Sequence, residues 1–450
     1  MISLRSLRNK LRGTSPTYPN ARLVKRWRGN LPDNPPDIHQ LIISQNVRIP
    51  NTHNVLALTS GGSGVRWSLF RPNMQNCPAD DSFIFCDVHS ESLLNDVRLD
   101  LVEKKFNIKH LKLDDFDQNS WRYNPLKYIY NTDDINALSL CIANNVLRFV
   151  QPELTTCIKI LNAMICYIWT IEEERSPASA SLPSVYKLIA EHATFLSCKN
   201  TDNGFASLTD FQTKINQLSS IKFKSLDEKE AQERIKFINA EWDDVTQDNS
   251  SGALFKKLSD RLSFLIRTDI QSRLCYDNIS LNNFIKPQAA LFISLSFCDT
   301  SYDFIASLIC MQLLRMKHQA KAIDSTMHLY LAEPVRIGRL PELQFAKDEN
   351  INLIMSVKDS SEAIACLDIS DSNDNKIKTI NAIGLFDVLT EFGTVSSGTL
   401  ADFAKEIKIP TATAYFMYRK SENCFVWFPN IDSVVEDKKY IQPFSNKKCS

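Results

Sequence analysis

The chain has 450 residues, of which 44% are hydrophobic and 23% charged, an ordinary composition for a globular protein with two or three domains. Its 52 Lys and Arg residues balance its 52 Asp and Glu residues. This balance excludes a protein that is drawn to nucleic acid or anionic membrane by its overall charge.

The first 50 residues predict a basic arm with at most one short strand, because they are rich in Pro and Arg and show little periodicity. The segment could contact phosphates or lipid headgroups, or it could be a solvated leader. It has no apolar core of the kind that a signal peptide needs. Eight basic residues and no acidic one precede Pro32, namely Arg5, Arg8, Lys10, Arg12, Arg22, Lys25, Arg26 and Arg28.

The twelve cysteines stand singly and predict buried free thiols, as in a reducing cytoplasm. There is no C-x-x-C pair, and the seven histidines are scattered without ligand spacing, so the sequence predicts no metal site. The cysteines within apolar runs are Cys86, Cys141, Cys166, Cys298 and Cys310.

The fold is expected to be organised around residues Asn54 to Glu91, where two apolar strands frame a glycine turn and a short helix, and the second strand ends at Asp87. Gly61, Gly62 and Gly64 fall within four positions, although the chain has only 11 glycines. A buried strand, a glycine turn and a helix are the setting of a phosphate-binding loop.

The phosphate-loop motif G-x-x-x-x-G-K-[ST] is nevertheless not fulfilled. With Gly64 as the second glycine, Thr59 stands at the first glycine, Val65 at the lysine and Arg66 at the hydroxyl position. The glycines could still bind a phosphate through their backbone amides, or they could serve only the turn from strand to helix.

Strand and helix patterns alternate after this stretch and favour a parallel sheet. A block that reads as helical throughout, from Gln151 to about Asn278, interrupts them. The expected elements are a helix over 90–106, a strand over 108–113, a turn at 123–126, a helix over 133–149, an amphipathic helix over 225–245, a strand over 288–297, a helix over 302–316, a strand over 327–332, a short helix over 341–347 and a strand over 351–357.

This order predicts a discontinuous α/β domain with an all-helical insertion, because strands before and after a helical block most economically complete one sheet. The segment Cys157 to Ile171 is the best candidate for a membrane span, but about 15 residues with a lysine predict a buried helix instead. The predicted parts are the arm over 1–50, the first α/β part over 51–150, the insertion over 151–284 and the second α/β part over 285–450.

Taken together and in order, these stretches resemble the TraG-like coupling proteins of conjugative and type IV transfer, which are RecA-like P-loop ATPases. The resemblance covers most of the chain, although no single piece is specific. It rests on VLALTSGGSG at 55–64 with Arg71-Pro72-Asn73, on Asp87-Val88-His89-Ser90-Glu91, on Tyr123 to Ile129, on the strand and helix over 291–314, on Leu331-Ala332-Glu333-Pro334 with Ile337-Gly338-Arg339-Leu340-Pro341, and on the tail from Cys424 to Ile441.

The departures from the family pattern fall on its chemistry. Val65 replaces the Walker A lysine, Arg66 replaces the hydroxyl that binds magnesium, and of the Walker B acid pair only Glu333 remains, beside Ala332. Glu349 and Lys358 stand where the family has an arginine and a glutamine. Because phosphoryl transfer needs the lysine and Mg²⁺ to balance developing charge, the resemblance implies an ATPase fold that has lost turnover.

Several residues keep two readings. Arg66 could replace the missing lysine as a cation or lie free on the surface; Glu333 could be a base or a vestigial acid at a strand end. Asp87 could face a ligand crevice or cap the next helix. His89 is expected to be exposed. Trp121, Arg122 and Tyr123 could stack on a base or pack beneath the sheet.

The resemblance implies a catalytically impaired coupling-like protein that recruits or joins the transfer machinery. Its alternatives are an active DNA-transfer ATPase with an unusual loop, and an interaction protein that keeps only the fold. Partners so implied are the secretion or conjugation machinery, a relaxase or DNA, and a ring formed with itself or with an intact paralogue. ATP and Mg²⁺ binding would be weak or lost, and the place of action would be the cytoplasm or, peripherally, the cytoplasmic membrane face, without the family's usual transmembrane pair. The implied nucleotide-binding positions are Ser60, Gly61, Gly62, Ser63, Gly64, Val65, Arg66 and Asp87, with Glu333 at the catalytic position.

Overall fold

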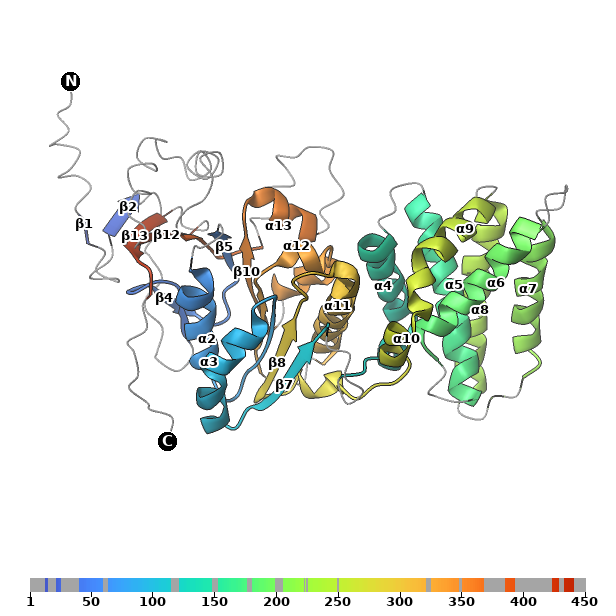
Figure 1. The fold of residues 1–450 in the computed structure, drawn as a ribbon, viewed down its shortest axis with the longest axis horizontal. Coiled ribbons are helices and arrows are strands. Elements are labelled where there is room, and N and C mark those ends of the chain that lie inside the picture. Colours follow the sequence, from blue (N-terminus) through green and yellow to red (C-terminus); the bar gives the residue numbers. More distant parts are fainter. Residues whose placement is uncertain are drawn as a thin grey trace, which may run out of the picture. The chain divides into compact units, whose positions relative to one another are not determined.

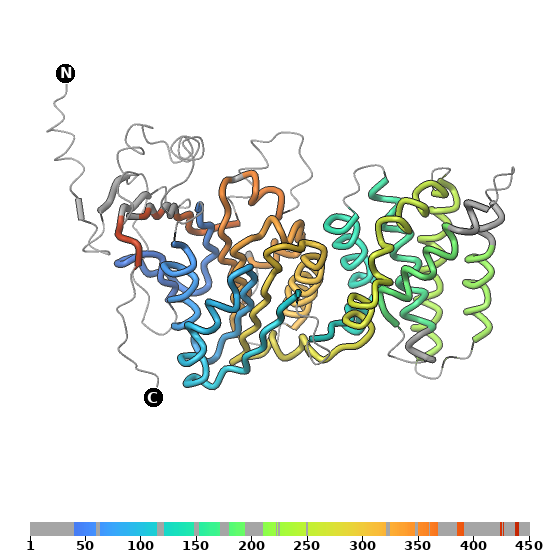
Figure 2. Tube along the Cα trace, in the orientation of Figure 1, coloured from blue at the N-terminus to red at the C-terminus, as the bar shows by residue number. Residues whose placement is uncertain are grey.

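The structure, a computed structural model, describes most of the chain between residues 40 and 367 and parts of both ends (Figures 1 and 2). The described ranges are 13–14, 22–25, 40–59, 64–114, 121–147, 153–175, 180–198, 205–221, 223, 226–248, 251–320, 325–347, 350–367, 385–392, 423–428 and 433–440.

The chain forms two compact units, each with its own core. The α/β unit comprises Met1–Leu113, Asn282–Thr300 and Met316–Ser450, and the helical unit comprises Asp114–Leu281 and Ser301–Arg315. The helical unit thus interrupts the α/β unit along the sequence. It begins at Asp114 rather than at the expected residue 151, because the helix that follows residue 131 packs against the first long helix of this unit.

Seven parallel strands form the larger part of the sheet in the α/β unit and confirm the predicted parallel sheet. The strands expected around positions 55, 108, 288, 327 and 351 are all present, each within two or three residues of its predicted bounds. In spatial order the seven are β11 (Val388–Phe392), β5 (Val55–Thr59), β10 (Ile351–Val357), β9 (Met327–Leu331), β6 (Ser82–Asp87), β8 (Ala289–Ser294) and β7 (Asn107–Lys112).

Four antiparallel strands extend the sheet beyond β11. They join the two ends of the chain, since β13 pairs with β2. In spatial order they are β12 (Asn423–Phe428), β13 (Ser433–Lys438), β2 (Arg22–Lys25) and β1 (Gly13–Thr14).

The expectation of an arm with at most one strand over residues 1–50 is wrong, because β1 and β2 lie in the main sheet and β3 (Gln40–Ile42) pairs with β4 (Arg48–Pro50). The turn between β3 and β4 is fastened to the other end of the chain, where the buried carboxylate of Asp437 accepts hydrogen bonds from the Ser44 hydroxyl and the Asn46 backbone amide, both at 2.7 Å. A partner nearly 400 residues away leaves no local pattern in the sequence.

Both faces of the central strands are buried, as their continuous apolar runs require. One face carries aromatic side chains that meet edge to face, with ring centroids 5.4 Å apart for Phe83 and Phe292 and 5.8 Å apart for Phe83 and Tyr330. On the opposite face Ile84 and Leu329 are 0% and 1% exposed. A strand slipped by one residue would exchange these two sets, so the packing fixes the register.

Short helices follow the strands of the α/β unit (Figure 1). The helix expected after residue 64 begins as a π-helical turn, Arg66–Phe70, and continues as α2 (Arg71–Gln75). The others are α3 (Ser90–Glu103), α12 (Pro334–Ile337), a 3₁₀ turn over Pro341–Lys347 and α13 (Ser360–Cys366).

The helical unit is built around aromatic side chains, with Phe211 and Trp242 at a centroid distance of 4.6 Å and His192 and Phe255 beside them. Its helices are α4 (Thr132–Ile142) with a π-helical turn over Ala143–Leu147, α5 (Glu153–Arg175), α6 (Leu182–Cys198), α7 (Phe205–Leu218), α8 (Glu228–Gln247), α9 (Ser251–Leu262), α10 (Thr268–Leu274) and most of α11 (Asp303–Gln319).

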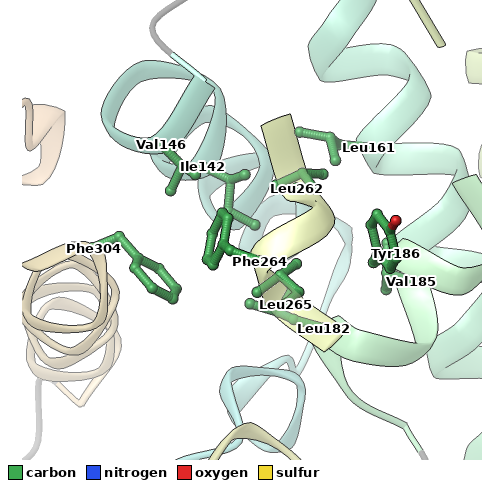
Figure 3. A pocket seen from close by; sticks show the side chains of 10 residues that line it. All are labelled: Ile142, Val146, Leu161, Leu182, Val185, Tyr186, Leu262, Phe264, Leu265 and Phe304. Carbon is green, nitrogen blue, oxygen red and sulfur yellow. The ribbon is translucent and has the colours of Figure 1, made fainter. Parts of the chain in front are cut away.

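Figure 3 shows a small apolar cavity in this unit, of about 10 Å³, where Ile142, Leu265 and Phe304 converge from three elements. Its lining side chains are apolar apart from the hydroxyl group of Tyr186, fewer polar partners than a buried water molecule needs, so the cavity is a packing defect. Among the described residues one segment, Glu153–Ile171, is long and apolar enough to cross a membrane, and 67% of its most apolar window is buried within the protein. That degree of burial is typical of a core helix, as predicted for residues 157–171.

The described cysteines are all free thiols, as expected. Cys86, Cys141, Cys166 and Cys310 are buried, and burial raises the pKa of Cys166 and Cys310 to about 12. The expectation is wrong for Cys298, which is exposed because it lies in the loop after β8 rather than in the strand.

Candidate functional site

The loop after β5 is described from Gly64 onward. The predicted nucleotide-binding residues Ser60, Gly61, Gly62 and Ser63 lie outside the described residues. Gly64 has a φ of +77°, in the left-handed region that favours glycine, and a Cβ added there would meet nothing within 4 Å. Its carbonyl oxygen accepts the N–H groups of Trp67 and Ser68, both at 3.0 Å. The backbone conformation, and not lack of space, therefore requires glycine where the helix begins.

Val65, at the lysine position of the motif, belongs to the core. Its residue is 9% exposed and packs in the same cluster as Leu69 and Phe70. An isopropyl group provides neither a charge nor a hydrogen-bond donor to a phosphate. Position 65 therefore serves packing.

Arg66 joins two acidic residues at the ends of neighbouring strands, Asp87 as the last residue of β6 and Glu333 two residues after β9. Its Nε and Nη2 donate to Oδ2 and Oδ1 of Asp87, the second at 2.9 Å, and Nη2 also donates to Oε1 of Glu333 at 3.3 Å. β6 and β9 run in parallel, with Cys86 opposite Leu331, so the carboxylates that follow lie at one edge of the sheet. Arg66 is thus held in the site rather than free on the surface.

Asp87 is fully buried, with 0% of its side chain exposed. The expectation that it could cap the next helix is wrong, because the cap residue of α3 is His89, whose side chain makes no capping hydrogen bond. A buried carboxylate is stable only with a cation or several hydrogen-bond donors, and the forked guanidinium of Arg66 provides both.

Glu333 is half-buried and lies between like and unlike charges. Its pKa is raised above the ordinary 4.5, mainly by burial and then by the negative charge of Asp87, while Arg66 and Arg336 act in the opposite direction. Nη1 of Arg336 lies 3.9 Å from Oε2 of Glu333. A carboxyl group with a raised pKa is suited to accept a proton, but Arg66 already binds the oxygen that would do so.

A pocket of about 550 Å³ opens beside these residues, at the carboxyl ends of β5, β9 and β10, where ligands bind in open α/β sheets. Thr59 and Ser356 contribute to its lining, and their hydroxyl oxygens are 2.8 Å apart. The pocket is lined by Thr59, Gly64, Val65, Arg66, Trp67, Ala332, Glu333, Pro334, Val335, Arg336, Ser356, Val357, Lys358 and Glu362.

The structure therefore brings four of the predicted positions together, namely Gly64, Val65, Arg66 and Glu333, with Asp87 buried behind Arg66. Lys358 also lines the pocket, with its side chain 78% exposed. Glu349 lies outside the described residues.

The aromatic segment near residue 121 belongs to the helical unit. The expectation that these side chains pack in a core is confirmed, but the expected place beneath the sheet is wrong. Tyr123 is 0% exposed, donates its hydroxyl to Gln312 at 2.6 Å and stacks on Tyr128. Trp121 is 4% exposed beneath the guanidinium of Arg273. Neither ring is available to stack on a base. His89 is exposed, as expected.

Sequence reasoning missed several residues of the pocket, among them Trp67, Arg336 and Glu362. Trp67 is 47% exposed, with the guanidinium of Arg71 5.6 Å from its ring. The sequence signal for Arg336 and Glu362 was their spacing from an oppositely charged residue. Arg336 follows Glu333 by three residues and Glu362 follows Lys358 by four, which are the spacings of ion pairs on one helical turn.

No model of a known protein family matches the chain, and neither does any curated protein. Solved structures do match. The bacterial conjugative coupling protein TrwB, in an unbound form, is 12% identical, with 91% of this chain and 90% of that chain covered at a TM-score of 0.56. TrwB in complex with ADP and Mg²⁺ is 12% identical, with 97% of each chain covered at 0.57. VirB4 of Thermoanaerobacter pseudethanolicus is 11% identical, with 91% and 98% covered at 0.51.

These matches cover nearly the whole of each chain, the helical unit included. The chain thus shares its α/β fold with the coupling protein TrwB and with VirB4, and its predicted resemblance to conjugative coupling proteins is confirmed for the fold. At identities this low, likeness shows shared architecture, and activity has to be argued from the site.

Proposed function

We propose that this protein is a coupling-like component of a conjugative or type IV transfer machinery that no longer hydrolyses ATP and acts by recruiting or joining other components. The fold supports the first part. The second part rests chiefly on one observation, the bond network of Arg66 with Asp87 and Glu333 in the pocket where the phosphate loop opens.

Three groups that a P-loop ATPase uses have other roles in this chain. Position 65 contributes a packed valine instead of a lysine ammonium, position 66 a paired guanidinium instead of a free hydroxyl, and position 332 an alanine instead of a carboxylate. Glu333 could accept a proton from water, but its oxygens face Arg66 and Arg336. The loop offers no lysine at position 65 to stabilise a transferring phosphoryl group, and Lys358, which also lines the pocket, lies 3.9 Å from Glu362.

Weak nucleotide binding remains compatible with this arrangement, because Arg336 and Lys358 line the pocket and Gly64 keeps the turn. The partners that fit the proposal are an intact coupling ATPase, with which the chain would form a ring, and the relaxase or DNA that such machinery transfers. The proposal includes action in the cytoplasm or, peripherally, at the cytoplasmic face of the membrane.

The test is phosphate release from Mg²⁺·ATP by the purified full-length chain. We expect none above the protein-free blank, whereas active enzymes of this kind turn over at about 1 s⁻¹ or faster. A Glu333→Gln variant is the matched control, since release that persists unchanged in it comes from a contaminant. Turnover that the wild type shows and the variant loses would refute the proposal.

Recruitment is tested separately, by light scattering of the chain mixed with an intact coupling ATPase from the same transfer system. A mixed complex larger than either protein alone supports the accessory role. Two unchanged species, together with no binding of relaxase or DNA, would leave an interaction protein of another kind.

A further inference from the structure

Arg66 stands where a complete phosphate loop has the residue that binds its magnesium ion. In a complete phosphate loop the residue at this position carries the Ser or Thr hydroxyl that binds Mg²⁺, opposite the acids at the neighbouring strand ends. Here the side chain starts from the same point of the helix, in its first turn, and reaches the same strand ends. A monovalent organic cation thus extends into the space between helix and acids.

The carboxylate oxygens around this space already face cations. Both oxygens of Asp87 accept hydrogen bonds from Arg66, and Oε1 of Glu333 accepts one at 3.3 Å. Oε2 of Glu333 lies 3.9 Å from Arg336. Two negative carboxylates and two positive guanidinium groups make the cluster electrically neutral.

The residues present therefore do not fit the magnesium ion that the fold family implies. Mg²⁺ needs octahedral oxygen ligands, of which a P-loop site gives a hydroxyl and one or two carboxylates. Val65, Arg66 and Ala332 contribute no such oxygen from their side chains. Among the residues that the structure describes there is also no cluster of three His, Cys, Asp or Glu side chains that could hold a metal.

We propose that the guanidinium of Arg66 is a built-in replacement for the divalent cation: it occupies the cation's place between Asp87 and Glu333 and keeps the pocket free of metal. The proposal depends on the site geometry alone, and it would hold for an active or an inactive protein and for any partner. It also explains why both acids can persist next to an apolar Val65, because Arg66 balances them without a metal or a lysine.

Manganese binding to the full-length chain tests this, because the electron paramagnetic resonance signal of free Mn²⁺ disappears on binding. The wild type is expected to leave the signal unchanged at equimolar Mn²⁺. The Arg66→Ser variant, which frees both carboxylates and restores a hydroxyl, should bind one Mn²⁺ with affinity about tenfold or more above that of the wild type. The double variant Arg66→Ser with Asp87→Asn should lose this gain.

Two results would overturn the proposal: a folded Arg66→Ser variant that gains no Mn²⁺ site, or a wild-type Mn²⁺ site that Glu333→Gln abolishes. The second needs only a conservative change at a partly exposed side chain, so it decides the matter even if Arg66→Ser does not fold. The Arg336→Ser variant, which keeps Arg66, is the matched control and should bind no more Mn²⁺ than the wild type. ATP turnover by a metal-free wild type would refute the proposed function and leave this inference standing.

Discussion

Replacing Arg66 by methionine should destabilise the edge of the sheet that carries the candidate site. The change keeps much of the side chain's apolar length and removes the guanidinium, so that Asp87, with 0% of its side chain exposed, keeps its charge without a cation. Breaking a fully buried pair in this way costs about 3–5 kcal/mol. Because 31% of the Arg66 side chain is exposed, water can reach one side of the pair, and we expect about 2 kcal/mol.

Hydrogen exchange of the β6 amides measures this cost locally, which matters because a chain of two units need not unfold in one step. A loss of about 2 kcal/mol accelerates exchange roughly thirtyfold, since about 1.4 kcal/mol corresponds to a factor of ten. Adding Asp87→Asn should recover at least half of the loss, because the uncompensated charge is then gone. Arg71→Met is the matched control on the same helix, where the guanidinium lies over Trp67. Exchange rates for Arg66→Met no different from those of Arg71→Met would refute the reasoning.

Three further changes test the groups that hold the site and the second core. Asn73→Ala should lower the free energy of unfolding, measured by urea denaturation, by about 2–3 kcal/mol. The buried side-chain amide of Asn73 accepts a hydrogen bond from the N–H of Ile42 at 2.7 Å and donates one to its carbonyl oxygen at 2.8 Å. An unchanged free energy of unfolding would contradict this. Gly64→Ala should lower the free energy of unfolding by about 1–2 kcal/mol in the same assay, because its φ of +77° strains any residue with a Cβ. An added Cβ would meet no atom within 4 Å, so the strain is in the backbone alone, and Gly64→Asn should cost less because asparagine tolerates this φ better. Burial lowers the pKa of His192 below 6.5, so as pH falls the unfolded chain takes up this proton before the folded one. The thermal stability of the helical unit should therefore decrease below about pH 6.5, and the decrease should be smaller in His192→Phe.

The sequence predicted most of the sheet because parallel strands that are buried on both faces read as apolar runs. The segments 55–59, 289–294 and 351–357 could be assigned without knowing their partners. β11 (Val388–Phe392) escaped notice because five residues with a charged Glu391 are a weak signal, and its place beside β5 depends on pairing with a strand more than 300 residues earlier. β2 (Arg22–Lys25) escaped for the same reason, since it pairs with β13.

The candidate site was predictable in its positions and not in its contacts. The order of motifs indicated that positions 65, 66, 87 and 333 belong together. It could not indicate that Arg66 reaches two acids, because these are 21 and 267 residues away and the choice of partner depends on side-chain direction at the sheet edge. A paired arginine and a free surface arginine have the same sequence pattern.

The substitutions at positions 65 and 66 make physical sense only together. Val65 packs in the core cluster, but unlike the lysine of a complete phosphate loop it provides no positive charge near the fully buried carboxylate of Asp87. Arg66 restores that charge one residue further along the helix and directs it at the strand ends instead of the loop. Because Val65 also lines the pocket, a lysine at position 65 could extend its ammonium into that space. It would lose the contacts of the isopropyl group with the core cluster, and Arg66 would still lie between the two acids, so this single substitution would not restore a complete phosphate-binding site.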